Sequence, residues 1–186
     1  MIRNFWGMFF GAVLLLGAMD GNAAEIVKGA AAQIDRDARA ALGRLYAKVP
    51  AAKALGSKAY AILVFPKITK AGLMIGGQYG EGVLLKGRKA IAYYSTGGAS
   101  YGLQAGAQTY GYAMFFMTRK SVNQLDDAQG FEGGVGPSVV LIDEGMAKTT
   151  TTTTMNEDIY AFVFGQKGLM AGLGVQGNKI SKMTPK

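Results

Sequence analysis

Residues 59–85 read AYAILVFPKITKAGLMIGGQYGEGVLL, and this stretch decides the fold class of the chain. Its first part, Ala59–Phe65, is a short apolar run rich in residues that favour strands. Pro66 is expected to end this strand, because proline cannot donate a hydrogen bond to a sheet. The second part, Gly72–Leu85, is also strand-like but contains several glycines. The stretch therefore predicts two β-strands that begin a sheet.

The remainder of the chain is dominated by further strand-like segments. Gly87 marks a hairpin turn after the second strand. One helix is expected over Ser121–Gln129, with Ser121 as its N-cap. The run Thr149–Thr154 predicts a strand because threonine is β-branched. The other expected strands are Ala90–Ser95, Tyr101–Thr118 (as one strand or two), Ser138–Ile142, Ile159–Gly165 and Leu169–Val175.

The motif Gly-Leu-x-x-Gly occurs three times, at residues 72–76, 102–106 and 168–172. Glycine inside a strand usually marks a bulge, sheet curvature or the close approach of another backbone. We therefore expect an α+β fold with a strongly curved, glycine-rich antiparallel β-sheet or partial barrel. An N-terminal amphipathic helix would lie against its glycine-lined face, accompanied by one or two short helices.

That helix is predicted over Glu25–Val49. Apolar residues recur there at steps of three and four, which places them on one stripe, and Pro50 ends the pattern. Ala51–Lys58 predicts a second, short helix. Residues 25–58 thus form a basic amphipathic helical region, and residues 59–186 form the glycine-rich sheet region of the same domain.

Residues 1–24 have the layout of a secretory signal peptide. Arg3 supplies the positive start, Phe5 to Met19 is almost wholly apolar, and small residues precede Glu25. The apolar run of 15 residues is shorter than the roughly 20 that a membrane-spanning helix needs. An uncleaved N-terminal anchor is the alternative. The prediction is an exported protein, periplasmic or peripheral to a membrane, without a lipoprotein cysteine.

Composition excludes several classes of enzyme. The 186 residues include no His and no Cys, so a Ser-His-Asp triad, a thiolate nucleophile and imidazole or thiolate metal ligands are all ruled out. Residues 98–102 match the G-x-S-x-G pattern around Ser100, but the base is lacking. The glycine-rich loop at 133–137 lacks the Lys-Ser/Thr of a phosphate-binding loop. We expect no catalytic residues, no metal site and no cofactor.

The net charge of +8 is concentrated near the N-terminus. Residues 25–70 hold nine basic and three acidic residues, a surplus of six. Such a basic amphipathic segment is typical either of a helix with a solvated face or of one that lies on anionic lipid. Nucleic acid is not an expected partner, because the tyrosines of the sheet lie apart from these charges.

The chain resembles the SYLF domain, a lipid-binding family shared by bacterial exported proteins and eukaryotic actin-patch regulators. The resemblance spans about residues 30–182. It is carried by the basic helix, by the apolar strand followed by Lys-x-x-Lys-Ala-Gly at 67–72, by YYSTGGASYGLQAGAQTYGYAMFFMT at 93–118, and by Lys-Gly-Leu-Met-Ala-Gly at 167–172.

The resemblance implies a non-catalytic domain that binds anionic membrane phospholipids. In a bacterial envelope these would be phosphatidylglycerol, cardiolipin or the phosphates of lipopolysaccharide. By position, the implied lipid-binding residues are Lys28, Arg36, Arg39, Arg44 and Lys48 on the helix, with Lys67 and Lys70 as a second cluster. The alternative is a structural or protein-interaction module of the periplasm that does not bind lipid. A less favoured alternative is an enzyme that uses either Ser100 paired with a lysine or a metal ion held by carboxylates.

Overall fold

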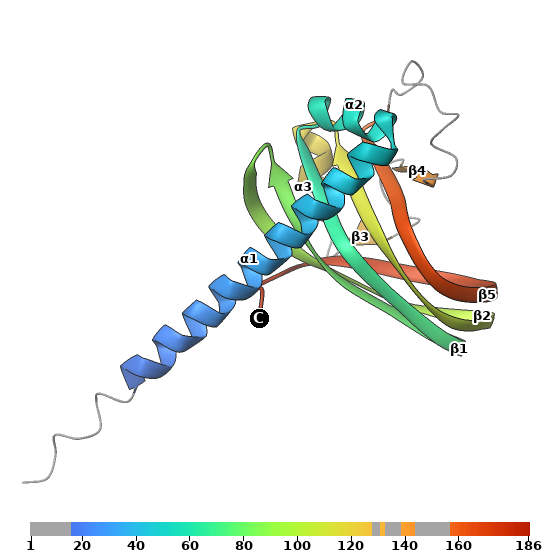
Figure 1. Ribbon diagram of the computed structural model, residues 1–186, viewed down its shortest axis with the longest axis horizontal. Coiled ribbons are helices and arrows are strands. Elements are labelled where there is room, and N and C mark those ends of the chain that lie inside the picture. Colours follow the sequence, from blue (N-terminus) through green and yellow to red (C-terminus); the bar gives the residue numbers. More distant parts are fainter. Residues whose placement is uncertain (1–15, 128–130, 133–138, 144–156) are drawn as a thin grey trace, which may run out of the picture.

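The computed structural model describes residues 16–127, 131–132, 139–143 and 157–186 (Figure 1). This part of the chain forms three helices and five strands, which confirms the α+β class. The helices are α1 (Leu16–Lys48), α2 (Pro50–Lys58) and α3 (Arg119–Asp127). The strands are β1 (Ala61–Lys86), β2 (Lys89–Phe116), β3 (Phe131–Glu132), β4 (Val139–Asp143) and β5 (Ile159–Met183). The expected threonine strand and the loop at 133–137 lie outside the described residues.

Three very long antiparallel strands build the sheet. Strands β1, β2 and β5 have 26, 28 and 25 residues. The turn at Gly87, where φ is +57°, joins β1 to β2 as predicted. Strand β2 pairs with β5 along almost its whole length, and the two short strands pair with opposite ends of β5. The strand order is β1-β2-β5-β3, with β4 parallel to β5.

The expectation that Pro66 ends a strand is wrong. Strand β1 continues through Pro66, with a register shift between Phe65 and Ile68. Because β1 is at the edge of the strand order, its proline does not interrupt hydrogen bonds to a strand on the other side. Lys67 and Lys70, which follow this proline, consequently lie within β1. The strands expected separately at Ala90–Ser95 and Tyr101–Thr118 are likewise joined in the single strand β2. Those expected at Ile159–Gly165 and Leu169–Val175 are parts of β5.

The expectation of a strongly curved or barrel-like sheet is also wrong, since the sheet is open. Among the described residues, no pairing joins β1 to β3 or β4. The glycines instead allow distant parts of strand β1 to approach each other. A Cβ on Gly82 would lie 2.6 Å from the Phe65 ring, and a Cβ on Gly80 would lie 2.8 Å from the side chain of Ile68. These glycines therefore admit apolar side chains of the same strand, and not the helix.

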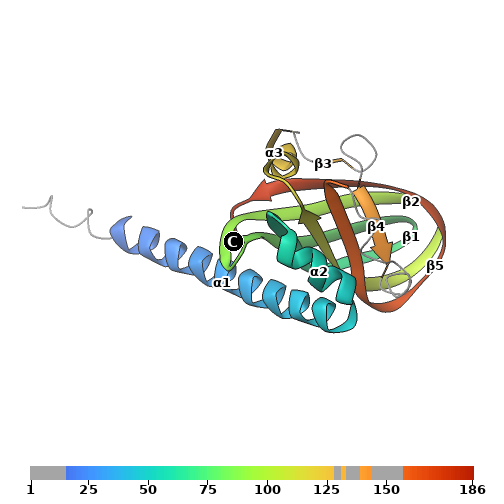
Figure 2. The same ribbon diagram turned by 90° about the horizontal axis from the view of Figure 1, so that it is seen from above.

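Helix α1 packs onto the face of the sheet that carries Val64, Val83 and Leu85. The predicted stripe is buried from Ile34 onward, and α1 and α2 share a core with β1, β2 and β5. Ile26, at the other end of the stripe, is exposed. The N-terminal half of α1 projects beyond the sheet in both views (Figures 1 and 2). No helix within the described residues combines the length and the apolar character needed to cross a membrane.

A second core lies on the opposite face of the sheet, where α3 packs (Figure 2). Val122 and Leu125 of α3 are buried there with the Leu63 and Phe65 side chains of β1. The long strands are thus buried on both faces where the helices cover them. This explains why their helix-covered ends read as continuous apolar runs.

Helix α3 begins one turn earlier than predicted, with Thr118 rather than Ser121 at its cap. The Ser121 amide donates a hydrogen bond to Thr118 Oγ1 (3.1 Å), and the Thr118 amide donates one to Ser121 Oγ (3.3 Å). This reciprocal pair satisfies two amide groups that the helix itself leaves without partners.

Replacing Thr118 by alanine is expected to lower the free energy of unfolding by about 1 kcal/mol, because the cap oxygen is removed. Urea denaturation measures the change. The Thr118→Ser variant keeps the oxygen and should retain most of the stability. Equal losses in the two variants would show that the methyl group matters and the cap does not.

A basic candidate site between helix α1 and the sheet

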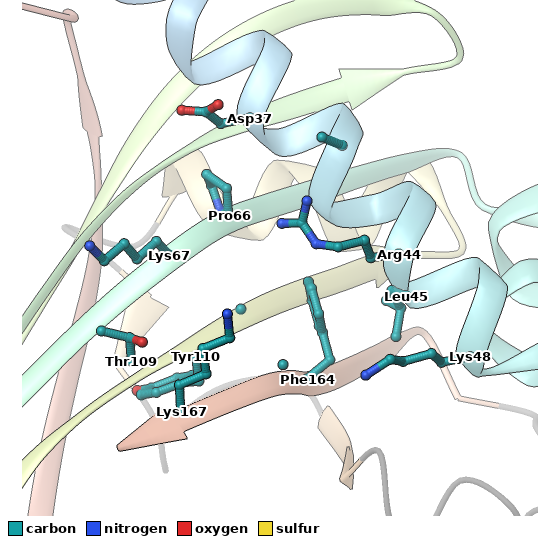
Figure 3. A pocket seen from close by; sticks show the side chains of 13 residues that line it. Asp37, Arg44, Leu45, Lys48, Pro66, Lys67, Thr109, Tyr110, Phe164 and Lys167 are labelled. Carbon is teal, nitrogen blue, oxygen red and sulfur yellow. The ribbon is translucent and has the colours of Figure 1, made fainter. Parts of the chain in front are cut away.

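A pocket of about 670 Å³ opens where the C-terminal half of α1 faces the ends of β1, β2 and β5 (Figure 3). Helix α1 contributes five of its residues, and the three long strands contribute the others. The lining residues are Asp37, Ala40, Arg44, Leu45, Lys48, Pro66, Lys67, Thr109, Tyr110, Gly111, Phe164, Gly165 and Lys167. We call this cavity the basic pocket.

Cations dominate the wall of the basic pocket. Arg44 and Lys48 come from α1, Lys67 from β1 and Lys167 from β5, whereas Asp37 is the one acid among the lining residues. Four positive charges and one negative charge give the lining a net charge of +3. Figure 3 shows Arg44, Lys48 and Lys167 around the Phe164 ring. Side chains of this type converge on phosphate or carboxylate groups.

The helical spacing explains why two of these cations meet. Arg44 and Lys48 are four residues apart, so they occupy the same face of α1, one turn above the other. Leu45 lies beside them and is buried against the sheet, which fixes the rotation of the helix about its axis. The stripe that packs the helix therefore also aims its basic edge at the pocket.

The strands give the pocket an apolar and hydroxyl-bearing side. Phe164 is buried, and Gly111 makes room for it, because a Cβ on Gly111 would lie 2.5 Å from the Phe164 ring. The Tyr110 hydroxyl donates a hydrogen bond to Gln78 Oε1 (2.9 Å), and burial raises the pKa of Tyr110. Together with Thr109, these residues allow the pocket to contact both a charged group and the carbon atoms attached to it.

The structure separates the seven residues implied by the SYLF resemblance. It brings Arg44, Lys48 and Lys67 together at the pocket. Lys28 and Arg36 are exposed on α1 and do not line it, and Lys70 is half-buried farther along β1. Arg39 forms an ion pair with Asp35 (3.0 Å) and donates a hydrogen bond to the Arg88 carbonyl (2.8 Å). Arg39 therefore ties α1 to the β1–β2 turn.

Sequence reasoning missed Lys167 and its neighbours Tyr110 and Phe164. Lys167 is the first residue of the Lys-Gly-Leu-Met-Ala-Gly stretch, which served only to support the resemblance. The register explains its place, since Lys167 pairs with Thr109, and Thr109 pairs with Thr69, close to Lys67. Only the pairing of β1, β2 and β5 reveals that these distant residues are neighbours.

The residues of the less favoured enzyme hypothesis lie elsewhere. Ser100 is buried in β2 and is not among the residues that line the basic pocket. Within the described ranges, no three acidic side chains gather as a metal site would require.

Comparison with known families gives one match. Residues 97–185 match the model of the Ysc84 family, described as "Las17-binding protein actin regulator". No curated protein matches the chain significantly. The matched residues include most of β2, all of α3 and the strands β3, β4 and β5, and they contain Lys167, Thr109 and Phe164 of the basic pocket. Residues 97–185 thus form a domain of the Ysc84 family, also known as SYLF, and the resemblance is confirmed over that range.

Proposed function

We propose that this protein is a non-catalytic domain that binds anionic phospholipids through the basic pocket. The observation that carries the proposal is the convergence of Arg44, Lys48, Lys67 and Lys167, from three separate elements, on one cavity with a single acidic residue. A phosphodiester headgroup supplies the negative charge that such a lining attracts.

The dimensions of the pocket suit a headgroup. Small-molecule sites have volumes of roughly 300–1,000 Å³, and the basic pocket lies in this range at about 670 Å³. The phosphate would contact the cations, while Tyr110 and Phe164 would contact the glycerol and the first carbons of the acyl chains. Arg44 and Lys167 are exposed, so their attraction for the phosphate is screened by salt.

The proposed location follows from residues 1–24. A signal peptide there would export the domain to the periplasm, where it would associate peripherally with a membrane that contains phosphatidylglycerol or cardiolipin. Lys28 and Arg36, on the projecting half of α1, would add a longer-range attraction to the same surface.

The test is a comparison of two charge reversals with equal changes in net charge. The pocket variant is Arg44→Glu with Lys167→Glu, and the control variant is Lys28→Glu with Arg36→Glu. All four side chains are exposed, so both variants should fold. Flotation with vesicles of phosphatidylglycerol and phosphatidylcholine should show the pocket variant at least about tenfold weaker than the control.

Salt provides the second measurement. Binding of the unaltered protein should weaken as sodium chloride is raised, and vesicles of phosphatidylcholine alone should not bind it. Equal binding by the pocket and control variants would refute the pocket as the headgroup site. Binding that ignores both salt and lipid charge would refute recognition of the headgroup by charge, and no binding to any vesicle would favour the protein-interaction alternative.

A further inference from the structure

Large apolar side chains are exposed where the three long strands run out beyond the helices. Leu73 is 75% exposed, Ile75 69%, Tyr101 69% and Leu169 88%. The middle sections of β1, β2 and β5, residues 71–77, 99–107 and 168–177, lie away from the helices at the right of Figure 1, and we call this part of the sheet the sheet tip. Single exposed apolar residues are ordinary, but a group of this size marks an interaction surface.

Register gathers these side chains into one place. Ile75 pairs with Tyr101, Leu73 pairs with Ala105, and Ala107 pairs with Leu169. The three Gly-Leu-x-x-Gly motifs therefore lie next to one another across the three strands. Met74 lies between Leu73 and Ile75, is 57% exposed, and has a φ of +63°. A backbone angle that is costly for methionine thus accompanies three consecutive exposed apolar side chains.

The sheet tip carries no charge, and lysines border it. The sequence has no charged residue at 71–80, 90–118 or 168–178. The nearest basic residues along the strands on the side of the helices are Lys67, Lys70 and Lys167, which we call the lysine collar. Lys179 lies on the other side of the tip, where it pairs with Glu132 of β3. Lys70 pairs with Gln108, which pairs with Gly168, so the collar crosses the sheet in nearly one row. On that other side, Glu81 accepts a hydrogen bond from the Tyr79 hydroxyl (2.8 Å).

We propose that the sheet tip inserts into the interface of an anionic lipid bilayer, with the lysine collar at the level of the phosphates. Leu73 is three residues beyond Lys70, which corresponds to about 10 Å along a strand. Interfacial elements bury their apolar face about 5–10 Å below the headgroups, so the two spacings agree. A wholly cationic collar complements a layer of phosphates better than it complements a second copy of the same collar.

This inference rests on the proposed function for its partner, a membrane, but on different residues. Lys67 and Lys167 belong both to the collar and to the basic pocket. Insertion of the sheet tip would therefore bring the pocket to headgroup depth, where a lipid could enter it without leaving the bilayer. The pocket would select the headgroup, and the tip would anchor the domain.

A single fluorescent label tests the insertion. The chain has no cysteine, so Leu169→Cys and Ser57→Cys each offer one site for an environment-sensitive nitrobenzoxadiazole dye. Ser57 is exposed on α2, away from the tip, and serves as the matched control. On phosphatidylglycerol vesicles, the label at 169 should shift to the blue and be quenched by brominated acyl chains. The label at 57 should do neither. An unquenched label at 169 on bound protein would overturn the inference.

A second variant separates the tip from the pocket. Leu73→Ser with Ile75→Ser and Leu169→Ser changes only exposed side chains, so the fold should persist. Its vesicle binding should weaken at least about tenfold, because apolar area no longer enters the bilayer. Its binding of soluble glycerol 3-phosphate, measured by calorimetry, should match that of the unaltered protein.

The other outcomes are equally decisive. Unchanged vesicle binding by the serine variant overturns the sheet tip and leaves the pocket standing. Loss of glycerol 3-phosphate binding only in the pocket variant supports the pocket independently. A quenched label at 169 combined with no effect of the pocket variant keeps the tip and refutes the proposed function. A dimer in ultracentrifugation that the serine variant converts to a monomer, with no quenching at 169, assigns the tip to a second copy and overturns the inference.

Discussion

Phe115→Ala is expected to lower the free energy of unfolding by about 3–5 kcal/mol. Phe115 is completely buried in the core shared by α1, α2 and the sheet. Its ring meets Phe162 of β5 edge-on at 5.3 Å between centroids, and it meets Tyr46 of α1 at 6.3 Å. Removing the ring therefore leaves a cavity where the helix and two strands join, and this loss is a large part of the 5–15 kcal/mol that stabilises a typical domain.

Urea denaturation followed by circular dichroism measures the effect. Tyr101→Ala is the matched control, because it removes an aromatic ring from the same strand where that ring is 69% exposed. The control should change the stability by no more than about 0.5 kcal/mol. A Phe115→Ala variant as stable as the control would show that the helix is not held to the sheet through this ring.

Gly168→Ala is expected to destabilise the protein by about 3 kcal/mol, the second largest effect. Gly168 has a φ of +95°, which side-chain-bearing residues rarely adopt. An added Cβ would also press into the backbone carbonyl oxygen of Ala107 on the paired strand β2. Backbone cannot move aside as a flexible side chain can, so both penalties apply.

Two other glycines separate these penalties. Gly165 has a φ of +61° but no atom within 4 Å of an added Cβ, so Gly165→Ala should cost only the backbone term, roughly 1 kcal/mol. Gly97 has neither constraint, and Gly97→Ala should be neutral or slightly stabilising. If Gly168→Ala cost no more than Gly165→Ala, the close approach of β2 and β5 at this point would be disproved.

Local chemistry made much of the fold predictable. The three- and four-residue spacing of α1, the break before Pro50, where α2 begins, and the turn at Gly87 are each determined by nearby residues. The lengths of the strands could not be predicted in this way. Pro66 is an interruption only if strands lie on both sides of it, and the sequence does not state that β1 is an edge strand.

The positive charge of the basic pocket was predictable from the sequence, but the full set of residues that line it was not. The surplus of basic residues at 25–70 led to Arg44, Lys48 and Lys67, which line the basic pocket. Arg39 looked equivalent to Arg44, but the packing of α1 against the β1–β2 turn directs it to the Arg88 carbonyl. Lys167 is 100 residues from Lys67 in the chain, and only the antiparallel register places it opposite the helix.

The proline in strand β1 has a consequence for the behaviour of the protein at high concentration. An uncovered edge strand displays amide and carbonyl groups on which a strand from another molecule can grow, and this is a common route to aggregation. Pro66 deletes one amide donor from that edge, the adjoining register shift breaks its regularity, and the charge of Lys67 repels an identical neighbour. Pro66 and Lys67, which line the basic pocket within one molecule, thus also help to keep separate molecules from joining their sheets.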